Sequence, residues 1–312
     1  MASCVDVIIV NWNSGAQLRT CVESLLVFGD GLIAKIIVVD NDSKDGSVDF
    51  LFKVPSVTLI RADRNMGFGR ACNVGACEAS SNYLLFLNPD TRVMPEALRI
   101  VCDYMNSEAA TFVGICGVKL VDEQGRIHRH CARFPSWLTF VGLSVGVSKL
   151  LPRQLPSHVM TEFDHKTNHI VDHVIGAFYF VRRELYLKLQ GFDERYFVYL
   201  EDLDFSFRAN QADWLTFYLA DATVIHKGGG VSEQVKAHRL FYSLRSRILY
   251  AFKHFKRSEA WLVTILTLVV EPFPRMLRAI LHVSMVEARD ILSGFVMLWR
   301  DFPGYIRRAH RD

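Results

Sequence analysis

Residues 83–90 read Tyr-Leu-Leu-Phe-Leu-Asn-Pro-Asp, an apolar run that ends in a polar turn. An uninterrupted apolar run of this length is typical of a strand that is buried on both faces of a parallel sheet. Three earlier runs have a similar form, namely Val5–Val10, Ile33–Val39 and Val57–Ile60. Between and after these runs, apolar residues recur at helical spacing in Leu18–Val27, Val48–Phe52, Gly69–Ala79 and Ala97–Met105. This alternation predicts an α/β fold with a mixed, mostly parallel sheet flanked by helices.

Polar, turn-forming residues directly follow each of the four runs. They are Asn11-Trp12-Asn13, Asp40-Asn41-Asp42-Ser43, Arg61–Gly69 and Asn88-Pro89-Asp90. Ligands of open α/β sheets bind beyond the carboxyl ends of the strands. The sequence therefore predicts a nucleotide pocket at this edge of the sheet.

The second half of the chain is less regular. From Val121 to about Asp172 no period is clear, and we expect a long excursion that shapes a substrate cleft or an irregular surface insertion. The later predicted elements are a strand at Val174–Val181, helices at Arg183–Leu189 and Glu201–Gln211, and short strands at Thr216–Leu219 and Thr223–Ile225. Beyond Val235 the pattern is almost wholly helical.

Charge is unevenly distributed along the 312 residues, although the net charge is only +3 and gives no reason to expect nucleic acid. Residues 236–312 hold fourteen Lys and Arg against six Asp and Glu, a local net charge of +8, which leaves −5 for residues 1–235. The basic region predicts an anionic partner. The seven cysteines form no CxxC pair, and Val5–Val10 is too short for a signal peptide, so we expect reduced thiols and a cytoplasmic location.

The turn Asn88-Pro89-Asp90 suits a metal site. A carboxylate that follows a buried strand is placed to bind Mg²⁺ or Mn²⁺ together with a diphosphate, because hard cations prefer oxygen ligands. Asn-Pro-Asp is also good turn chemistry without any ligand. Similarly, Asp40 is placed to accept hydrogen bonds from a pyrimidine ring or a ribose, while its neighbours also suit a turn and a helix cap.

The segment Arg64–Gly69 opens a helix that contains Asn73. Glycines allow close backbone approach, and a helix N-terminus beside an arginine favours phosphate. The segment is not the dinucleotide fingerprint, which follows the first strand, so a dehydrogenase is a weaker interpretation.

Two later segments carry further candidates. In Tyr199–Phe205, either Glu201 or Asp202 is placed to take a proton from an acceptor hydroxyl, although acidic residues also stabilise helix starts. His226 ends a strand and precedes three glycines, which suits a metal or diphosphate contact, although a lone histidine is more often structural.

Taken in order, these segments resemble glycosyltransferase family 2, the inverting enzymes of the GT-A fold, and in particular its bacterial rhamnosyltransferase branch. The matching stretches are Val-Asn-Trp-Asn (10–13), Val-Asp-Asn-Asp-Ser (39–43), Asn-Met-Gly-Phe-Gly (65–69), Phe-Leu-Asn-Pro-Asp (86–90), Gly-Ala-Phe (176–178), Gly-Phe-Asp-Glu-Arg-Tyr-Phe (191–197), Glu-Asp-Leu-Asp-Phe (201–205) and the segment around His226. The resemblance runs from Val5 to about Lys256.

The resemblance implies a role for each candidate residue. Asp90 would contact the metal with His226, and Asp202 would be the general base. Asp40 would read the nucleobase, and Gly176, Ala177 and Glu201 would lie near the donor sugar and acceptor. The nucleotide-sugar site would include Asn11, Asn13, Asp40, Asp42, Arg64, Asn65, Gly67, Phe68, Asn73 and Asn88. Asn88 departs from the aspartate that is common elsewhere in the family.

The implied activity is transfer of a sugar, with inversion, from a nucleotide-sugar to a hydroxyl of a glycan or lipid-linked glycan in cell-surface polysaccharide synthesis. The branch favours dTDP-L-rhamnose, while UDP- and GDP-sugars remain open. A GT-A protein that binds without turnover is the alternative from another class. The catalytic domain would span residues 1–235, with a nucleotide-sugar half (1–120) and an acceptor half (121–235).

Residues 236–312 would form a helical C-terminal region. The apolar run Trp261–Val270 stops at Glu271-Pro272, too short to cross a bilayer, and later runs are broken by charges. With the Lys and Arg surplus, this pattern predicts amphipathic helices lying on the inner face of the cytoplasmic membrane. It fits equally a helical domain packed on the core or a homodimer interface.

Overall fold

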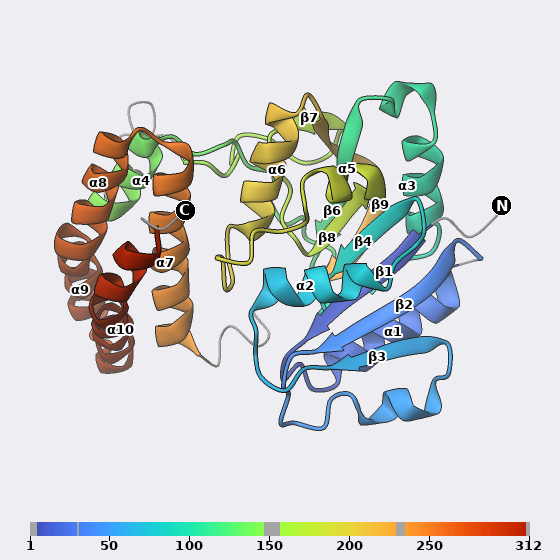
Figure 1. Cartoon of the computed structure of the whole chain (residues 1–312), viewed down its shortest axis with the longest axis horizontal. Helices are drawn as coiled ribbons and strands as arrows, with labels where there is room; N and C mark the ends of the chain where they lie inside the picture. Colours follow the sequence, from blue (N-terminus) through green and yellow to red (C-terminus); the bar gives the residue numbers. More distant parts are fainter. Residues whose placement is uncertain (1–4, 30, 147–156, 229–234, 310–312) are drawn as a thin grey trace. The chain divides into compact units, whose positions relative to one another are not determined.

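The computed structural model describes residues 5–29, 31–146, 157–228 and 235–309, with side chains to residue 304. The chain divides into two compact units, whose elements are labelled in Figure 1. The first unit takes in the chain up to Phe134, Val159–Glu194 and Glu201–Val231. The second takes in Pro135–His158, Arg195–Leu200 and the chain from Ser232 onward. The helical unit thus includes residues 135–158 and 195–200 in addition to the predicted region 236–312.

The first unit is built on a nine-stranded sheet with the order β3-β2-β1-β4-β8-β6-β9-β5, in which β7 pairs with β9. Its parallel part comprises β3 (Val57–Arg61), β2 (Ile33–Asp40), β1 (Val5–Asn11) and β4 (Tyr83–Leu87). The remaining strands are β5 (Thr91–Val93), β6 (Val113–Val121), β7 (His169–Val171), β8 (Phe178–Arg182) and β9 (Leu215–His226). Because β3, β2, β1 and β4 are parallel, their carboxyl ends share one edge.

Helices cover both faces of this sheet. The face that includes Val7 and Ile9 packs against α1 (Gln17–Phe28) and α3 (Ala97–Met105). The face that includes Ile8 and Val10 packs against α2 (Phe68–Cys77), α5 (Arg183–Lys188) and α6 (Glu201–Gln211). Alternate residues of β1 therefore serve opposite cores, which explains why that strand reads as a nearly continuous apolar run.

Gly75 allows α2 to approach the sheet closely. A Cβ at this position would lie 2.6 Å from Cγ2 of Ile8. The close approach matters for the site because α2 begins at Phe68, beside the ends of β1 and β2.

The predicted first four strands and the helices at α1, α2, α3, α5 and α6 are confirmed, to within a few residues at their ends. The two short strands predicted at 216–219 and 223–225 are wrong as separate elements, because β9 is one strand with a register shift opposite Val118 and Lys119. The predicted strand at 174–181 begins only at Phe178. Among the strands and α-helices of the described residues, β5, β6, β7 and α4 (Trp137–Val145) were not predicted.

Helices α4, α7 (Lys236–His254), α8 (Arg257–Ile265), α9 (Pro272–Leu281) and α10 (Met285–Ala309) build the second unit. Its interior contains charge. Glu271 is almost fully buried and accepts hydrogen bonds from Arg247, Arg275 and the hydroxyl of Ser144. Burial alone would raise the pKa of Glu271, but the two guanidinium groups hold it below its ordinary value.

The apolar run Trp261–Val270 lies within a longer helix than its ten residues suggested. A π-helical segment, η4 (Leu266–Val270), joins α8 to α9, and the backbone N–H of Glu271 donates to the carbonyl of Leu266 over 2.9 Å. The wider turn accommodates Pro272, which lacks an N–H of its own. One continuous helix results, Arg257–Leu281, with 25 residues and a mean hydropathy of 1.4 in its most apolar window. Length and composition would let it cross a membrane.

Candidate active site

Asn11 and Asp40 lie side by side where β1 and β2 end. They are register partners in the parallel ladder, and Nδ2 of Asn11 donates to Oδ1 of Asp40 over 3.0 Å. The same amide nitrogen lies 3.0 Å from Oγ of Ser43 and 2.9 Å from Oγ of Ser47, and the hydroxyl of Ser14 donates to Oδ1 of Asn11. Asn11 is fully buried. Its structural role is therefore to hold Asp40 and the loop after β2 in place.

The loop after β1 is fastened to the loop after β2. The N–H of Asn13 donates to Oγ of Ser43 over 3.0 Å, and its Oδ1 accepts from the N–H of Lys44 over 2.7 Å. Asn13 and Asp42 both have positive φ angles, 47° and 65°. Asp42 pairs with the ammonium group of Lys44. Asn13 and Asp42, which were predicted to bind the nucleotide-sugar, thus lie in two loops that are hydrogen-bonded to each other beside Asp40.

Asn41, which the sequence did not single out, organises the loop after β3. Its Nδ2 donates to Oδ1 of Asn65 over 2.9 Å and to the carbonyl of Gly67 over 3.2 Å, and its Oδ1 accepts from the N–H of Met66. Gly67 has a φ of 89° directly before α2. Phe68 is partly buried, and Arg64 is exposed at the surface of this loop.

Asn73 is fully used by other protein groups. Its Nδ2 donates to the carbonyl of Phe192 and to Glu194, and its Oδ1 accepts from the hydroxyl of Tyr186 and the N–H of Phe192. A side-chain amide with four partners has little capacity left for a ligand. The structure therefore gives Asn73 a role in holding the 191–194 loop on α2, and its predicted contact with the donor stays a prediction.

Asp90 and His226 meet at the other end of the candidate site. Oδ1 of Asp90 lies 3.3 Å from Nε2 of His226, and both side chains are largely buried. The meeting arises because β5 pairs antiparallel with β9, which places Thr91 opposite His226. Nδ1 of His226 is buried with no hydrogen-bond partner among the described residues.

This pair suits two neighbouring ligands of a hard divalent cation. Two ligand atoms about 2.1 Å from one cation, at right angles to each other, lie about 3.0 Å apart. Among the described residues, no group of three or more His, Cys, Asp and Glu side chains is placed to hold a metal. A cation here would therefore need further oxygen ligands from a substrate diphosphate and water, as is common for Mg²⁺ sites.

His128, which the sequence did not single out, lies beside this pair. Its ring centroid is 6.0 Å from that of His226, with the rings nearly perpendicular. Burial lowers the pKa of His128, and the neighbouring His226 lowers it further. A neutral ring at neutral pH adds no positive charge that would repel a cation.

The carboxylate of Asp202 is held by backbone donors at the start of α6. Its Oδ2 accepts from the N–H of Gly176 over 2.8 Å, and its Oδ1 accepts from the N–H of Leu203 over 2.8 Å. Its side chain retains some exposure, 17% of its surface. Asp202 is thus fixed in orientation but still accessible, as a general base must be.

His173 lies behind Asp202. Its Nε2 is 3.8 Å from Oδ2 of Asp202, and its Nδ1 is 3.0 Å from Oγ of Ser206, which in turn hydrogen-bonds the hydroxyl of Tyr179 over 2.8 Å. Burial lowers the pKa of His173, against the opposing effect of Asp202. The only signal for His173 in the sequence was its position three residues before Gly176.

Glu201 differs from Asp202 in environment. It is buried, and its Oε2 has no hydrogen-bond partner among the described residues. Burial raises the pKa of Glu201 well above its ordinary value, and the charge of Asp202 adds to this effect. Burial therefore disfavours a charge on Glu201, and contact of Glu201 with a sugar stays a prediction.

Gly176 and Ala177 join the two ends of the candidate site. The N–H of Gly176 binds Asp202, while the carbonyl of Ala177 accepts from the N–H of Asn88 over 3.1 Å and from Oγ1 of Thr91 over 3.2 Å. Two consecutive residues therefore hold the carboxylate of Asp202 on one side and the turn that carries Asp90 on the other.

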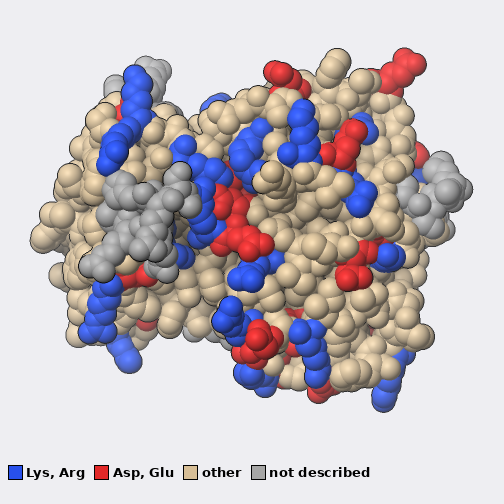
Figure 2. Space-filling view, in the orientation of Figure 1, with Lys and Arg blue, Asp and Glu red and all other residues tan. Residues whose placement is uncertain are grey.

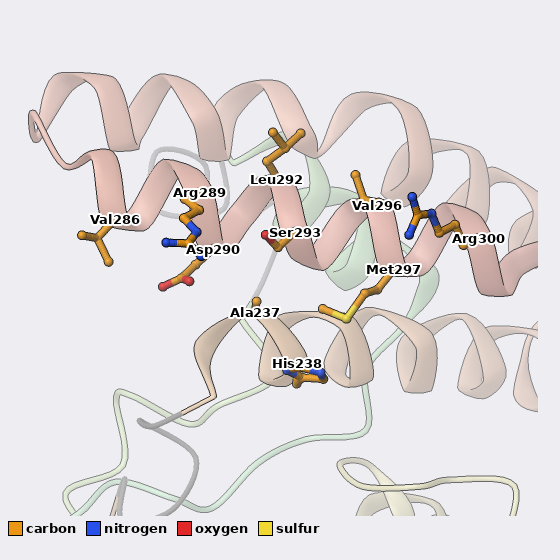
Figure 3. Close-up of a pocket in the computed structure, with 10 residues that line it drawn as sticks. All are labelled: Ala237, His238, Val286, Arg289, Asp290, Leu292, Ser293, Val296, Met297 and Arg300. Atoms are coloured by element: carbon orange, nitrogen blue, oxygen red, sulfur yellow. The ribbon is translucent and has the colours of Figure 1, made fainter.

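A separate hollow lies between α7 and α10 in the helical unit (Figure 3). Its lining residues are Ala237, His238, Val286, Arg289, Asp290, Leu292, Ser293, Val296, Met297 and Arg300. It includes none of the candidate residues at the strand ends. We therefore assign the chemistry to the strand-end site.

The fold and this site define a GT-A type glycosyltransferase. The sequence model of the family described as "Glycosyl transferase family 2" matches residues 6–189. The chain belongs to glycosyltransferase family 2, and its relatives include rhamnosyltransferases. The resemblance noted from the sequence is confirmed.

Two relatives illustrate this likeness. An N-acetylglucosaminyl-diphospho-decaprenol L-rhamnosyltransferase of Mycobacterium tuberculosis H37Rv is 24% identical over 268 residues, which cover 81% of this chain and 86% of the relative. The rhamnosyltransferase WbbL of Escherichia coli K12 is 28% identical over 169 residues, covering 51% of this chain and 60% of the relative.

Solved structures share the fold. A mannosyltransferase of Pyrobaculum calidifontis in complex with GDP-Man and Mn²⁺ has a TM-score of 0.54 at 16% identity, covering 99% of this chain and 86% of the other. The structure of residues 1–349 of Staphylococcus aureus TarS has a TM-score of 0.52 at 16% identity, covering 97% and 92%. At this identity the likeness concerns the fold alone.

Replacing Asn11 tests its structural role at the site. Asn11→Ala removes the donor that Asp40, Ser43 and Ser47 share and leaves buried acceptors unpaired. We expect the free energy of unfolding to fall by about 1–3 kcal/mol, measured by urea denaturation with circular dichroism. Asn82→Ala, at an exposed position, is the control. Equal stability of the two variants would contradict the role assigned to Asn11.

Proposed function

We propose that the protein transfers L-rhamnose from dTDP-L-rhamnose to a hydroxyl of a lipid-linked glycan, with inversion at the anomeric carbon and with bound Mg²⁺ or Mn²⁺. The observation that carries the proposal is the Gly176–Ala177 segment, which binds Asp202 on one side and the turn bearing Asp90 on the other. A base and a diphosphate site held a fixed distance apart are what a single in-line displacement requires.

In the proposed reaction, Asp202 accepts the proton of the acceptor hydroxyl as that oxygen attacks the anomeric carbon. The bond from this carbon to the diphosphate oxygen breaks, and the nucleoside diphosphate leaves with the electron pair. The N–H groups of Gly176 and Leu203 keep the carboxylate oriented throughout. Burial raises the pKa of Glu201 and so disfavours a second negative charge beside the base.

Asp90 and His226 would hold the divalent cation, and such a cation supplies charge neutralisation for the departing diphosphate. The 3.3 Å between Asp90 Oδ1 and His226 Nε2 supports this role. The Mn²⁺ in the Pyrobaculum complex supports it by analogy of fold.

At the opposite end of the site, Asp40 would bind the nucleobase or ribose, with Asn13, Asp42, Asn65, Gly67 and Phe68 forming the surrounding rim. Arg64, exposed on the loop after β3, would face the diphosphate or solvent. Asn11 and Asn41 would act by positioning these groups.

The proposed donor and acceptor follow from the relatives. Both are named as rhamnosyltransferases, and the mycobacterial name specifies a lipid-linked acceptor, N-acetylglucosaminyl-diphospho-decaprenol. UDP- and GDP-sugars are the competing donors, because the Pyrobaculum enzyme holds GDP-Man. A lipid-linked acceptor would place the protein at the cytoplasmic face of the membrane.

Donor binding is tested by thermal shift with dTDP-L-rhamnose, UDP- and GDP-sugars, each with Mn²⁺, with Mg²⁺ and with chelator. We expect dTDP-L-rhamnose with metal to raise the melting temperature, because a ligand at 100 times its Kd stabilises the folded state by about 2.7 kcal/mol. Chelator and Asp90→Asn should each remove most of the shift. Asp103→Asn, an exposed position on α3, should keep it.

A shift that occurs only with a UDP- or GDP-sugar would refute the proposed donor. A shift that survives both chelator and Asp90→Asn would refute the metal site. No shift with any donor would favour a GT-A protein that lacks transferase activity.

Asp202→Asn tests the base. The variant keeps the size of the side chain but can accept only one of the two backbone N–H groups. It cannot accept a proton, so donor binding should persist while transfer falls by about 10²–10⁴-fold. The readout is release of dTDP in the presence of a short-chain N-acetylglucosaminyl-diphospho-lipid. Asp213→Asn, an exposed position just beyond α6, is the matched control, and near-normal turnover of Asp202→Asn would exclude Asp202 as base.

A further inference from the structure

The helix Arg257–Leu281 turns its large apolar side chains outward. The face packed into the helical unit carries small apolar and polar residues, each with 1% exposure or less, namely Ala260, Val263, Thr264, Thr267, Glu271 and Ala279. The opposite face carries Leu262, Ile265, Val269, Phe273, Leu277 and Ile280, with exposed fractions between 41% and 72%. A surface helix in contact with water normally exposes polar and charged residues on that face.

The exposed residues form one continuous line, here termed the outer stripe, because each follows the last by three or four positions. The outer stripe is about 27 Å long at 1.5 Å per residue. It continues into the turn after α9, where Leu281, Val283, Met285 and Val286 are also highly exposed. An apolar surface of this extent marks a site of interaction.

Val283 adds an independent sign that this surface has a partner. It lies just after the end of α9 with a φ of 52° and is 87% exposed. Glycine or asparagine normally occupies such a left-handed position after a helix, and a β-branched residue is strained there. A large apolar side chain held at a strained and exposed position is explained if it contacts something apolar outside the chain.

The exposed charged residues of the helical unit are positive. The exposed Lys and Arg of the described residues 235–304 are Lys236, Arg239, Lys256, Arg257, Arg278, Arg289 and Arg300. Every Asp and Glu in that range is buried or half-buried. Four of the five acidic residues accept hydrogen bonds from the chain, as Glu287 does from Arg278. Figure 2 shows more Lys and Arg than Asp and Glu over this helical part on the face in view.

We propose that the outer stripe inserts into the headgroup region of an anionic lipid bilayer, with the helix lying parallel to the membrane plane. The apolar side chains would reach the acyl boundary, as in interfacial amphipathic helices. Lys256 and Arg257 at one end of the helix, and Arg278 toward the other, would contact anionic headgroups. Each cation near such a surface contributes about 1 kcal/mol.

The helix lies on the bilayer and does not cross it. Glu271 is embedded in the helical unit by Arg247, Arg275 and Ser144. Crossing would require this network to leave its packed position and enter hydrocarbon, where an unpaired carboxylate is costly.

A second copy of the chain fits this surface less well than lipid does. A two-fold dimer brings the same patch of both subunits together. The cations that border the outer stripe would then face one another, whereas an anionic leaflet attracts them all.

The inference deepens the proposed function, on which it rests for one point only: a membrane-bound surface would bring the site to a lipid-linked acceptor. Vesicle binding needs no sugar donor, so failure of the membrane inference and failure of the proposed transfer are separately visible.

The test is co-sedimentation of the full chain with vesicles of equal parts phosphatidylglycerol and phosphatidylcholine, compared with pure phosphatidylcholine. We expect binding to the anionic vesicles that weakens at least tenfold in Phe273→Asp/Leu277→Asp. Phe112→Asp/Leu187→Asp, which changes exposed apolar residues of the first unit, should bind like the unchanged chain. Arg257→Gln/Arg289→Gln should reduce binding and its salt dependence while leaving the outer stripe intact.

Circular dichroism and the melting temperature establish that each variant is folded. Unchanged binding of the Phe273/Leu277 variant, or no binding of the unchanged chain, would overturn the inference. Protein that resists release by high salt and alkaline carbonate would indicate a crossing helix and overturn it as well. If the unchanged chain does not bind vesicles but forms a dimer, and the Phe273/Leu277 variant is a monomer, the outer stripe is a surface for self-association.

Discussion

The pair of backbone groups in Gly176 and Ala177 is the constraint on which the candidate site depends. The N–H of Gly176 orients the carboxylate of Asp202, and the carbonyl of Ala177 receives the N–H of Asn88 and the hydroxyl of Thr91. A Cβ at Gly176 would lie 3.2 Å from Oδ2 of Asp202, so a larger residue here would press on that carboxylate. Because the segment leads directly into β8, the central sheet sets the distance between the base and the turn that carries Asp90.

The end of the site that contains Asp40 is held in shape by hydrogen bonds between protein groups. Asn11 and Asn41 are buried. The amide of Asn11 hydrogen-bonds Asp40, and the amide of Asn41 hydrogen-bonds Asn65 and the backbone of Met66. Such preorganisation reduces the cost of ordering the loops when a substrate binds. The division between buried asparagines that position and more accessible residues that bind is visible only in three dimensions.

Local patterns in the sequence predicted the parts of the fold that are locally determined. The strands that precede polar turns were found because parallel strands buried on both faces read as apolar runs, and α6 was found with both of its ends correct. Strand β6 was missed because two glycines and Lys119 break its pattern. Its central position comes from pairing with β8 and β9, which are distant in sequence.

The same distinction applies to the site. Asp90, Asp202 and His226 lie at element boundaries, where sequence patterns are informative. His173 and Asn41 were missed because their roles depend on partners outside their own segments, such as Ser206 for His173. Asn73 was expected at the donor because it lies in the helix that the segment Arg64–Gly69 opens, but Phe192, Glu194 and Tyr186 occupy its amide.

The central claim is that Asp90 and His226 hold a cation and the diphosphate of the donor, while Asp202 acts as the base. The most direct measurement is an anomalous difference map at the manganese absorption edge, from crystals grown with Mn²⁺ and dTDP. The account predicts one strong peak within bonding distance of Asp90 and of Nε2 of His226, with the diphosphate on the same ion. Bound dTDP with no manganese at this pair, or with manganese held elsewhere, would contradict it.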